Sequence, residues 1–237
     1  MIFAIESNSL NLSFCILKKG EVIGNFLLPI NNELSEVLIP TIKFFLKQNN
    51  ISLKDISVLA VGCGPGSFTG IRTIIACAKA IIISNKHIKS IGINSLGSLA
   101  MSVMDQAQKK NIKYIISSID SKRLEPFIQA FEIRNLKKKI NLHPINNIEA
   151  VKIDSLNNYL YKNNLHKHDI LFVGHNQELL NIKHTKIHLL KNKKNLADAL
   201  WVAKLSYFLI NYKEDLTKSI IGFENYKPIY VRFADIN

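Results

Sequence analysis

Short apolar runs alternate with polar turns over the first thirty residues, a pattern typical of β-strands. The runs predict strands over Ile2–Ile5, Leu12–Leu17 and Val22–Leu28. Between the last two, residues 18–21 read Lys-Lys-Gly-Glu, which has the composition of a hairpin turn. We therefore expect the chain to open with a three-stranded meander.

Helical and strand patterns alternate in the next segment. Apolar residues three and four apart predict helices, and short apolar runs bounded by polar residues predict strands. The expected elements are a helix over Glu33–Gln48, a strand over Ser57–Gly62, a helix over Thr69–Ser84, a strand over Ile88–Ile93 and a helix over Ser95–Gln106. Pro40 should kink the first helix or mark its first turns. A meander followed by this alternation is the layout of a ribonuclease-H-like lobe.

The second half of the chain again mixes strands and helices. Expected strands cover Ile112–Ile119, Phe127–Ile133, Asp169–Gly174, Thr185–Leu190 and Lys227–Phe233, and expected helices cover Asp154–Tyr161 and Leu196–Tyr212. This order predicts an α/β fold of two lobes. The first lobe is expected over 1–104 and a smaller second lobe over 105–195, with the boundary near 104–111. A helix over 196–212 should pack back on the first lobe, before a tail over 213–237 with a terminal strand.

Composition defines the class of protein. Of 237 residues, 47% are hydrophobic, 10 are Gly and 6 are Pro, which excludes a disordered or collagen-like chain. No apolar run approaches the ~20 residues of a membrane span. The start, Met1–Glu6, lacks the basic leader of a signal peptide, so we expect a cytoplasmic protein without membrane association. Cys15, Cys63 and Cys77 lack CxxC spacing, which argues against a disulfide framework and a cysteine zinc site.

The chain carries a formal net charge of +13, from 31 Lys and Arg against 18 Asp and Glu. Phosphates are common partners of a basic surface. The basic residues are spread over both halves of the chain, however, and its arginines are Arg72, Arg123, Arg134 and Arg232 alone. Few planar forks are therefore available to bind phosphate bidentately. We interpret the lysine excess, with its accompanying Asn and Ile, partly as a coding bias.

A glycine-rich loop joins one predicted strand to the next helix. Residues 62–72 read Gly-Cys-Gly-Pro-Gly-Ser-Phe-Thr-Gly-Ile-Arg. Such a loop brings backbone amides and the positive end of a helix together, as anion sites do, but it lacks the GxxxxGK[ST] spacing of a P-loop. An anion site and a tight structural turn both remain open. The weak candidates for anion or nucleotide contact are Glu6, Ser7, Gly64, Gly66 and Ser67.

The helix after this loop has two usable faces. Small residues follow one stripe, namely Gly70, Thr73, Cys77, Ala80 and Ser84. Apolar residues follow the other, namely Ile71, Ile74, Ile75, Ala78 and Ile82. One stripe is expected to pack on the helix's own sheet, while the other meets a second helix closely. Core packing of both faces and a partner interface remain open.

The segment Gly64–Arg72 resembles the signature of the bacterial TsaB (YeaZ) family, whose members take part in making threonylcarbamoyladenosine on tRNA. Further segments resemble the family in the same order. They are Ile2–Ser7, Leu34–Pro40, Gly92–Leu96, Asp120–Glu125 and Pro228–Arg232. The resemblance therefore spans nearly the whole chain.

This resemblance implies an actin-like, sugar-kinase-like α/β fold of two lobes and a non-catalytic accessory subunit. Members of the family bind and activate TsaD, the subunit that transfers the threonylcarbamoyl group to an adenosine of tRNA, and the ATPase TsaE joins them. The resemblance further implies indirect contact with tRNA through the complex, no cofactor of its own, ATP and Mg²⁺ only within the complex, and a homodimer when alone. Two positions depart from the family pattern: Glu6 replaces the usual Asp, and Leu34 the usual His.

The contact with TsaD is expected on two helices that join two helices of the partner in a four-helix bundle. Such an interface needs small residues for close approach and apolar residues for area. The expected small positions are Gly70, Thr73, Cys77 and Ala80, and the expected apolar positions are Leu34, Val37 and Thr41.

Two other functions were weighed against this one. An ATP-dependent phosphotransferase or ATPase of the same superfamily would use Glu6 for Mg²⁺ and Gly64–Gly66 for phosphate, but the second lobe lacks a Gly-rich phosphate hairpin. A peptidase would need a Ser–His–Asp or metal constellation, which the sequence does not offer.

The histidines and one charged loop complete the candidate chemistry. His184 and His188 have HxxxH spacing, but the segment alternates like a strand, where they would lie roughly 13 Å apart, so we expect no metal site. His166, His168 and His175 are expected to face solvent. The residues Asp120, Lys122 and Arg123 form either a nucleotide or RNA contact or, as we expect, a solvated loop.

Overall fold

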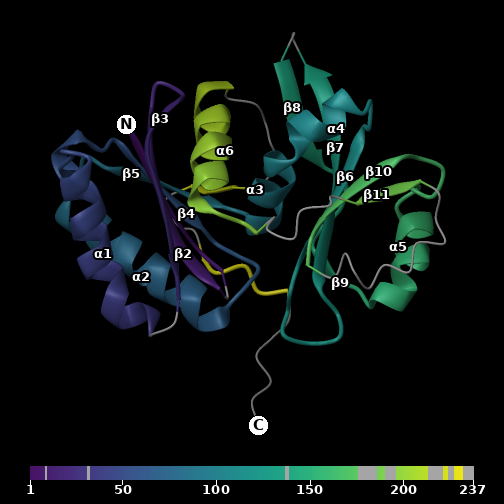
Figure 1. The fold of residues 1–237 in the computed structure, drawn as a ribbon, viewed down its shortest axis with the longest axis horizontal. Helices are drawn as coiled ribbons and strands as arrows, with labels where there is room; N and C mark the ends of the chain where they lie inside the picture. Colours follow the sequence, from purple (N-terminus) through teal and green to yellow (C-terminus); the bar gives the residue numbers. More distant parts are fainter. Residues whose placement is uncertain are drawn as a thin grey trace. The chain divides into compact units, whose positions relative to one another are not determined.

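The computed structural model describes residues 1–8, 10–30, 33–136, 139–175, 186–189, 196–212, 221–223 and 227–231 (Figure 1). Two compact units divide the chain. The first holds Met1–Ser98 and Ala197–Ile229, and the second holds Leu99–Leu196 and Tyr230–Asn237. The division falls at Ser98, earlier than the 104–111 boundary drawn from the sequence.

The first unit is built on a six-stranded sheet. Its strands are β1 (Ile2–Ser7), β2 (Asn11–Lys18), β3 (Glu21–Pro29), β4 (Val58–Gly62), β5 (Lys89–Ile93) and β12 (Ile221–Phe223), in the order β12-β5-β4-β1-β2-β3. Strands β1 to β3 form the predicted antiparallel meander, and β4 and β5 run parallel to β1. The turn between β2 and β3 is made by Lys19 and Gly20, both with positive φ, as a tight hairpin requires.

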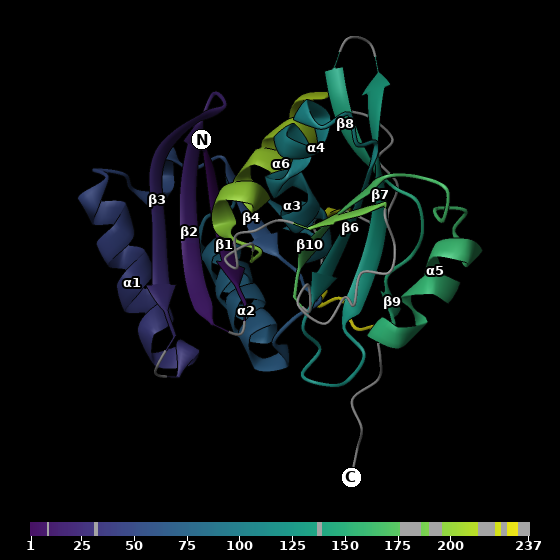
Figure 2. The ribbon, with the colours of Figure 1, turned by 45° about the vertical axis from the view of Figure 1, so that its right-hand side comes forward.

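Helices cover both faces of this sheet. Helices α1 (Leu34–Gln48) and α2 (Phe68–Ser84) contact each other and lie on one face, and α6 (Ala199–Tyr212) lies on the other, against β1, β2, β4 and β5 (Figures 1 and 2). The apolar core on the α1 and α2 side includes Phe3, Ile5 and Phe14 from the strands. Pro40 lies in the second turn of α1 with its side chain exposed.

The second unit has a sheet of the same topology. Its elements are β6 (Tyr114–Ile119), β7 (Phe127–Leu136), β8 (Lys139–Pro144), β9 (Glu149–Ala150), α5 (Leu156–Lys162), β10 (Ile170–Gly174) and β11 (Ile187–Leu189). The path β8-β7-β6-β10-β11 has a three-stranded meander followed by two strands parallel to β6, as β3-β2-β1-β4-β5 has in the first unit. The predicted fold class is confirmed: each unit has the ribonuclease-H-like strand order of actin-like and sugar-kinase-like folds.

Two predicted elements are wrong in part. The helix expected over Ser95–Gln106 is two helices, α3 (Ser95–Ser102) and α4 (Met104–Lys109), because the backbone of Val103 leaves the helical region. The terminal strand expected from Lys227 is absent from residues 227–231, where the N–H of Ile229 makes one bond to the carbonyl of Cys63. The edge of the sheet beside β5 is instead occupied by β12. Strand β8 was not predicted, since few of its residues are apolar.

Candidate functional site

The carboxyl end of β1 carries the first candidate group, Glu6. Its side chain is only 1% exposed. The hydroxyl of Ser95 donates to Oε2 at 2.8 Å, and the backbone N–H of Ser7 donates to Oε1 at 3.0 Å. Both carboxylate oxygens therefore accept a hydrogen bond from within the first unit.

Burial raises the pKa of Glu6 to about 7, against the lowering effect of the bonds from Ser95 and Ser7. The nearby Asp198, whose own pKa is raised by burial, acts in the same direction. Gly62 on the neighbouring strand permits this arrangement, because a Cβ there would lie 2.1 Å from Oε2 of Glu6. The carboxyl group of Glu6 is therefore buried and hydrogen-bonded, and its pKa lies near neutral pH.

Ser7 points to the opposite face of the sheet, since neighbouring residues of a strand alternate. Its hydroxyl lies against Gly70 of α2, 3.0 Å from where a Cβ of that glycine would be. The Ser7 Oγ is buried and has no hydrogen-bond partner among the described residues. The first turn of α2 is close by, and there Ser67 caps the helix by accepting the N–H of Gly70 at 3.3 Å.

The Gly64–Gly66 segment is a packed turn. Gly64 has a φ of +91° and is buried together with Pro65. Its carbonyl accepts the N–H of Ser95 at 2.8 Å, which ties the loop to the start of α3. The five anion candidates are therefore divided: Glu6 lies with Ser95 on one face, and Ser7 lies with Ser67 on the other.

The expected partner-binding residues fall into two groups. Leu34, Gly70 and Cys77 are buried, and the first and last belong to the apolar core beneath α1 and α2. The side chains of Val37, Thr41 and Thr73 are half-buried, and that of Ala80 is exposed. The two threonine hydroxyls donate to carbonyls one turn earlier in their own helices, those of Val37 and Thr69.

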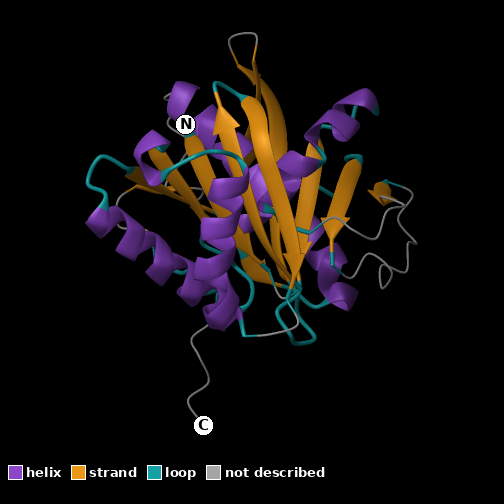
Figure 3. Ribbon diagram, turned by 60° about the vertical axis from the view of Figure 1, so that its left-hand side comes forward, coloured by secondary structure: helices purple, strands orange, loops and turns teal. Residues whose placement is uncertain are grey.

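The outward face of α1 and α2 carries large apolar side chains that the sequence analysis did not select. Ile39 and Phe44 of α1 are 44% and 54% exposed, and Phe68 and Ile83 of α2 are 44% and 76% exposed. The two helices lie side by side (Figure 3). Residues Ala76 and Ala80 are exposed on the same face of α2 as Ile83. We call this set of residues the α1–α2 face.

Residues 30–200 match the family model described as "TsaD: tRNA N6-adenosine threonylcarbamoyltransferase". The chain belongs to this family, in its TsaB (YeaZ) branch. The protein named tRNA threonylcarbamoyladenosine biosynthesis protein TsaB is 33% identical in Buchnera aphidicola subsp. Schizaphis graminum, over 50% of the chain and 55% of that protein. In Escherichia coli the protein of that name is 29% identical, over 53% of the chain and 52% of that protein. The chain therefore spans about half the length of the curated relatives it matches.

The structure described as YeaZ from Pseudomonas aeruginosa resembles the chain with a TM-score of 0.72. The alignment covers 97% of the chain and 98% of that structure at 16% identity, which shows a shared fold. The resemblance to the TsaB (YeaZ) family deduced from the glycine loop is confirmed. The two positions that depart from the family pattern are both buried. Glu6 is 1% exposed, and Leu34, in the apolar core, is 8% exposed.

Other sequence-based candidates are distributed over the second unit. His184 lies outside the described residues, while His188 lies in β11, as the strand pattern predicted, and pairs with Asp169 at 3.0 Å. His166 and His175, which were expected to face solvent, are half-buried, and the Nδ1 atom of each is buried. His168 is exposed as expected.

Further observations concern the remaining candidates. In the charged loop, Lys122 and Arg123 are exposed and Lys122 pairs with Asp120 at 3.2 Å. All three cysteines are free and buried. Within the described ranges, no group of three or more His, Cys, Asp or Glu side chains is arranged to hold a metal ion. None of the helices in those ranges has the length and apolar character to cross a membrane.

Proposed function

We propose that the chain is a non-catalytic activating subunit in the biosynthesis of N6-threonylcarbamoyladenosine on tRNA, where it binds TsaD and is joined by TsaE. It acts in the cytoplasm, reaches tRNA through the complex, and forms a homodimer when alone. Nucleotide chemistry belongs to the complex. Membership of the TsaB (YeaZ) branch and the names of its curated relatives support this proposal.

The hydrogen bonding and burial of Glu6 are the observation that supports a non-catalytic role for the chain. A carboxylate that holds Mg²⁺ presents an oxygen to the metal and to water. Both oxygens of Glu6 instead accept bonds from Ser95 and Ser7, and the raised pKa keeps the group partly protonated near neutral pH. This carboxyl group is thus suited to a structural contact.

The α1–α2 face supports a helical partner. Large exposed side chains on a soluble domain commonly mark a protein interface when they are contiguous. Here Ile83 supplies apolar area beside Ala76 and Ala80, which leave room for a helix of the partner to approach, while Phe44 packs edge-on against Phe26 of β3. The same face accounts for self-association in the absence of TsaD, because a two-fold dimer would bury it in both copies.

Ala80→Arg tests the contact with TsaD. A long charged side chain in a desolvated helix contact costs several kcal/mol when it has no partner. We expect the variant to keep the circular dichroism spectrum of the parent and to bind purified TsaD at least tenfold more weakly in calorimetry. Since Ala80 is exposed, this variant separates binding from folding; Cys77→Arg does not, because Cys77 is in the core.

The matched control is Asn157→Arg, which places the same side chain on an exposed position of α5. It should bind TsaD as the parent does. Unchanged TsaD affinity in Ala80→Arg would remove the α1–α2 face from the proposal. Failure of the parent itself to bind TsaD would overturn the proposed function.

An ATP-dependent phosphotransferase or ATPase is the second candidate. The unpartnered hydroxyl of Ser7 beside the first turn of α2 favours it, because a phosphate oxygen there would accept from that hydroxyl and from the helix amides. The closed carboxyl group of Glu6 opposes it. A measurement of ATP turnover by the pure chain decides between the two functions.

A further inference from the structure

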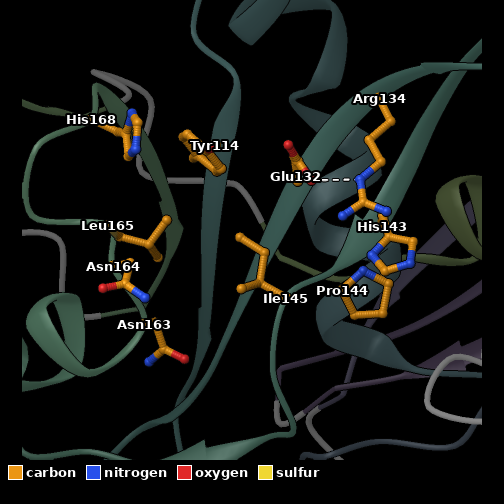
Figure 4. Close-up of a pocket in the computed structure, with 10 residues that line it drawn as sticks. All are labelled: Tyr114, Glu132, Arg134, His143, Pro144, Ile145, Asn163, Asn164, Leu165 and His168. Carbon is orange, nitrogen blue, oxygen red and sulfur yellow. Dashed lines mark hydrogen bonds and ion pairs between the residues drawn. The ribbon is translucent and has the colours of Figure 1, made fainter.

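The second unit contains a cavity of about 280 Å³ between its sheet and the segment that follows α5 (Figure 4). It lies near the start of β6, where Tyr114 is the first residue, and near the loop that leads into β10. This volume lies just below the ~300 Å³ at which the usual range of small-molecule cavities begins, so the cavity accommodates only a small ligand.

Three neighbouring strands place polar and aromatic side chains in one row along this cavity. Tyr114 of β6 pairs with Glu132 of β7, and Glu132 pairs with His143 of β8. Residues opposite each other in an antiparallel ladder project to the same face. Arg134, two residues after Glu132, projects to that face as well, and Figure 4 shows Glu132, Arg134 and His143 gathered on one side.

The carboxylate of this wall, Glu132, is paired with two cations. Glu132 accepts from Lys113 at 2.7 Å and from the Nε of Arg134. Burial alone would raise the pKa of Glu132, but these two bonds outweigh it and hold the pKa below its usual range, so the carboxylate is ionised. Arg134 lines the cavity and Lys113 does not, so the two ionised groups of the lining balance, and the terminal nitrogens of Arg134 are further donors.

One buried polar atom of the wall is unsatisfied. The Nδ1 of His143 has no hydrogen-bond partner in the described part of the chain. A buried polar group without a partner costs free energy, which a ligand that bonds to it would recover. This atom and Arg134 lie on adjacent strands of the same cavity wall.

The remaining walls combine apolar, aromatic and amide side chains. Ile145 lies between Leu165 and His143, and Leu165 lies on the side away from the polar row, near Asn164 (Figure 4). The ring of Tyr114 lies 4.7 Å from that of His168, centroid to centroid. The ring of Tyr114 and the side chains of Ile145 and Leu165 offer apolar surface to a planar base, and bases stack favourably on aromatic side chains.

The end of α5 explains why the loop wall has this form. Asn164 has a φ of +57°, its N–H donates to the carbonyl of Tyr161, and the N–H of Leu165 donates to that of Leu160. This is the Schellman arrangement that ends a helix and turns the chain sharply. It buries Leu165 and carries the following residues to His168 beside Tyr114.

We propose that this cavity binds a single nucleotide unit, with the base against Tyr114, Ile145 and Leu165 and the phosphate toward Arg134 and His143. An isolated divalent cation is disfavoured by the two cations around Glu132. An apolar molecule would leave the Nδ1 of His143 without a hydrogen-bond partner. The nucleotide comes either from the free pool or from an RNA strand, and this site does not depend on the contact with TsaD.

Calorimetry on the full chain tests the site with adenosine 5′-monophosphate, adenosine and inorganic phosphate. We expect the monophosphate to bind at least tenfold more tightly than either adenosine or phosphate, because it alone engages both walls. Arg134→Gln should weaken the monophosphate at least tenfold and adenosine much less. Lys110→Gln, which removes an exposed cation of the same unit that does not line the cavity, is the matched control and should change neither affinity.

A second cavity variant and the thermal midpoints show whether a loss of binding comes from misfolding. His143→Gln should also weaken binding of the monophosphate, and the thermal midpoint of each variant is compared with that of the parent. An unmodified tRNA transcript distinguishes the sources: weakening of tRNA binding by Arg134→Gln but not by Lys110→Gln assigns the site to an RNA nucleotide. A loss of binding confined to the free monophosphate assigns the site to the free pool.

The proposal would be overturned by a monophosphate affinity no higher than the affinity for phosphate. It would also be overturned by a monophosphate affinity that is equal in the parent and in both cavity variants.

Discussion

A single buried carboxyl group makes the stability of the first unit depend on pH. The pKa of Glu6 is about 7 in the folded chain, against 4.5 when unfolded. The folded state therefore holds a proton that the unfolded state releases between these values, and stability falls as pH rises from about 4.5 to 7. The fall amounts to about 3 kcal/mol, since each pKa unit corresponds to ~1.4 kcal/mol.

Glu6→Gln should remove this pH dependence, because an amide keeps hydrogen-bonding groups without the charge. Urea unfolding at pH 5 and pH 8 measures the difference. The parent should lose about 3 kcal/mol more than the variant over that range. Glu21→Gln, at an exposed glutamate, should lose as much as the parent. An equal loss in the parent and in Glu6→Gln would show that Glu6 does not control the dependence.

At the scale of elements, three helices end in the same way. Asn50, Asn111 and Asn164 follow α1, α4 and α5 with φ near +55°, and each is succeeded by an apolar residue whose N–H bonds back to the helix. Asparagine tolerates this left-handed backbone, and alanine does not. We expect Asn50→Ala to cost about 1 kcal/mol and Asn50→Gly close to nothing, measured as urea midpoints. Equal midpoints for the two variants would contradict this account of how α1 ends.

At the scale of the whole molecule, the shared topology of the two sheets does not by itself provide a catalytic site. Catalysis of phosphoryl transfer requires groups that hold metal and nucleotide. With Glu6 engaged by Ser95 and Ser7, we expect the pure chain to hydrolyse ATP no faster than buffer, with or without Mg²⁺, in a phosphate-release assay. Turnover that requires metal and disappears in Glu6→Ala would favour the phosphotransferase.

Local patterns in the sequence determined most of the first unit. The meander, α1, α2, β4 and β5 were predicted to within one or two residues, because their periodicity reports directly which backbone geometry buries the apolar side chains. The glycine loop carried the resemblance to the family. Its backbone needs glycine where φ is positive, as at Gly64. Strands β8, β9 and β12 were missed: few residues of β8 are apolar, and β9 and β12 have only two and three residues. Strands β8 and β12 form because each pairs with the hydrogen-bonding groups of a neighbouring strand. Their own residues do not show that such a neighbour is present.

The tertiary structure alone decided how the candidate residues are used. The helical pattern of α2 could not say which stripe meets the sheet, so Cys77 was expected at a partner surface and lies in the core, while Ile83 was passed over and is 76% exposed. The side chains of Glu6 and Ser7 were expected near one another, yet strand alternation sends them to opposite faces. The cavity joins Tyr114, Glu132 and His143 from three strands by register. Register depends on pairing between distant segments, which only the folded chain establishes.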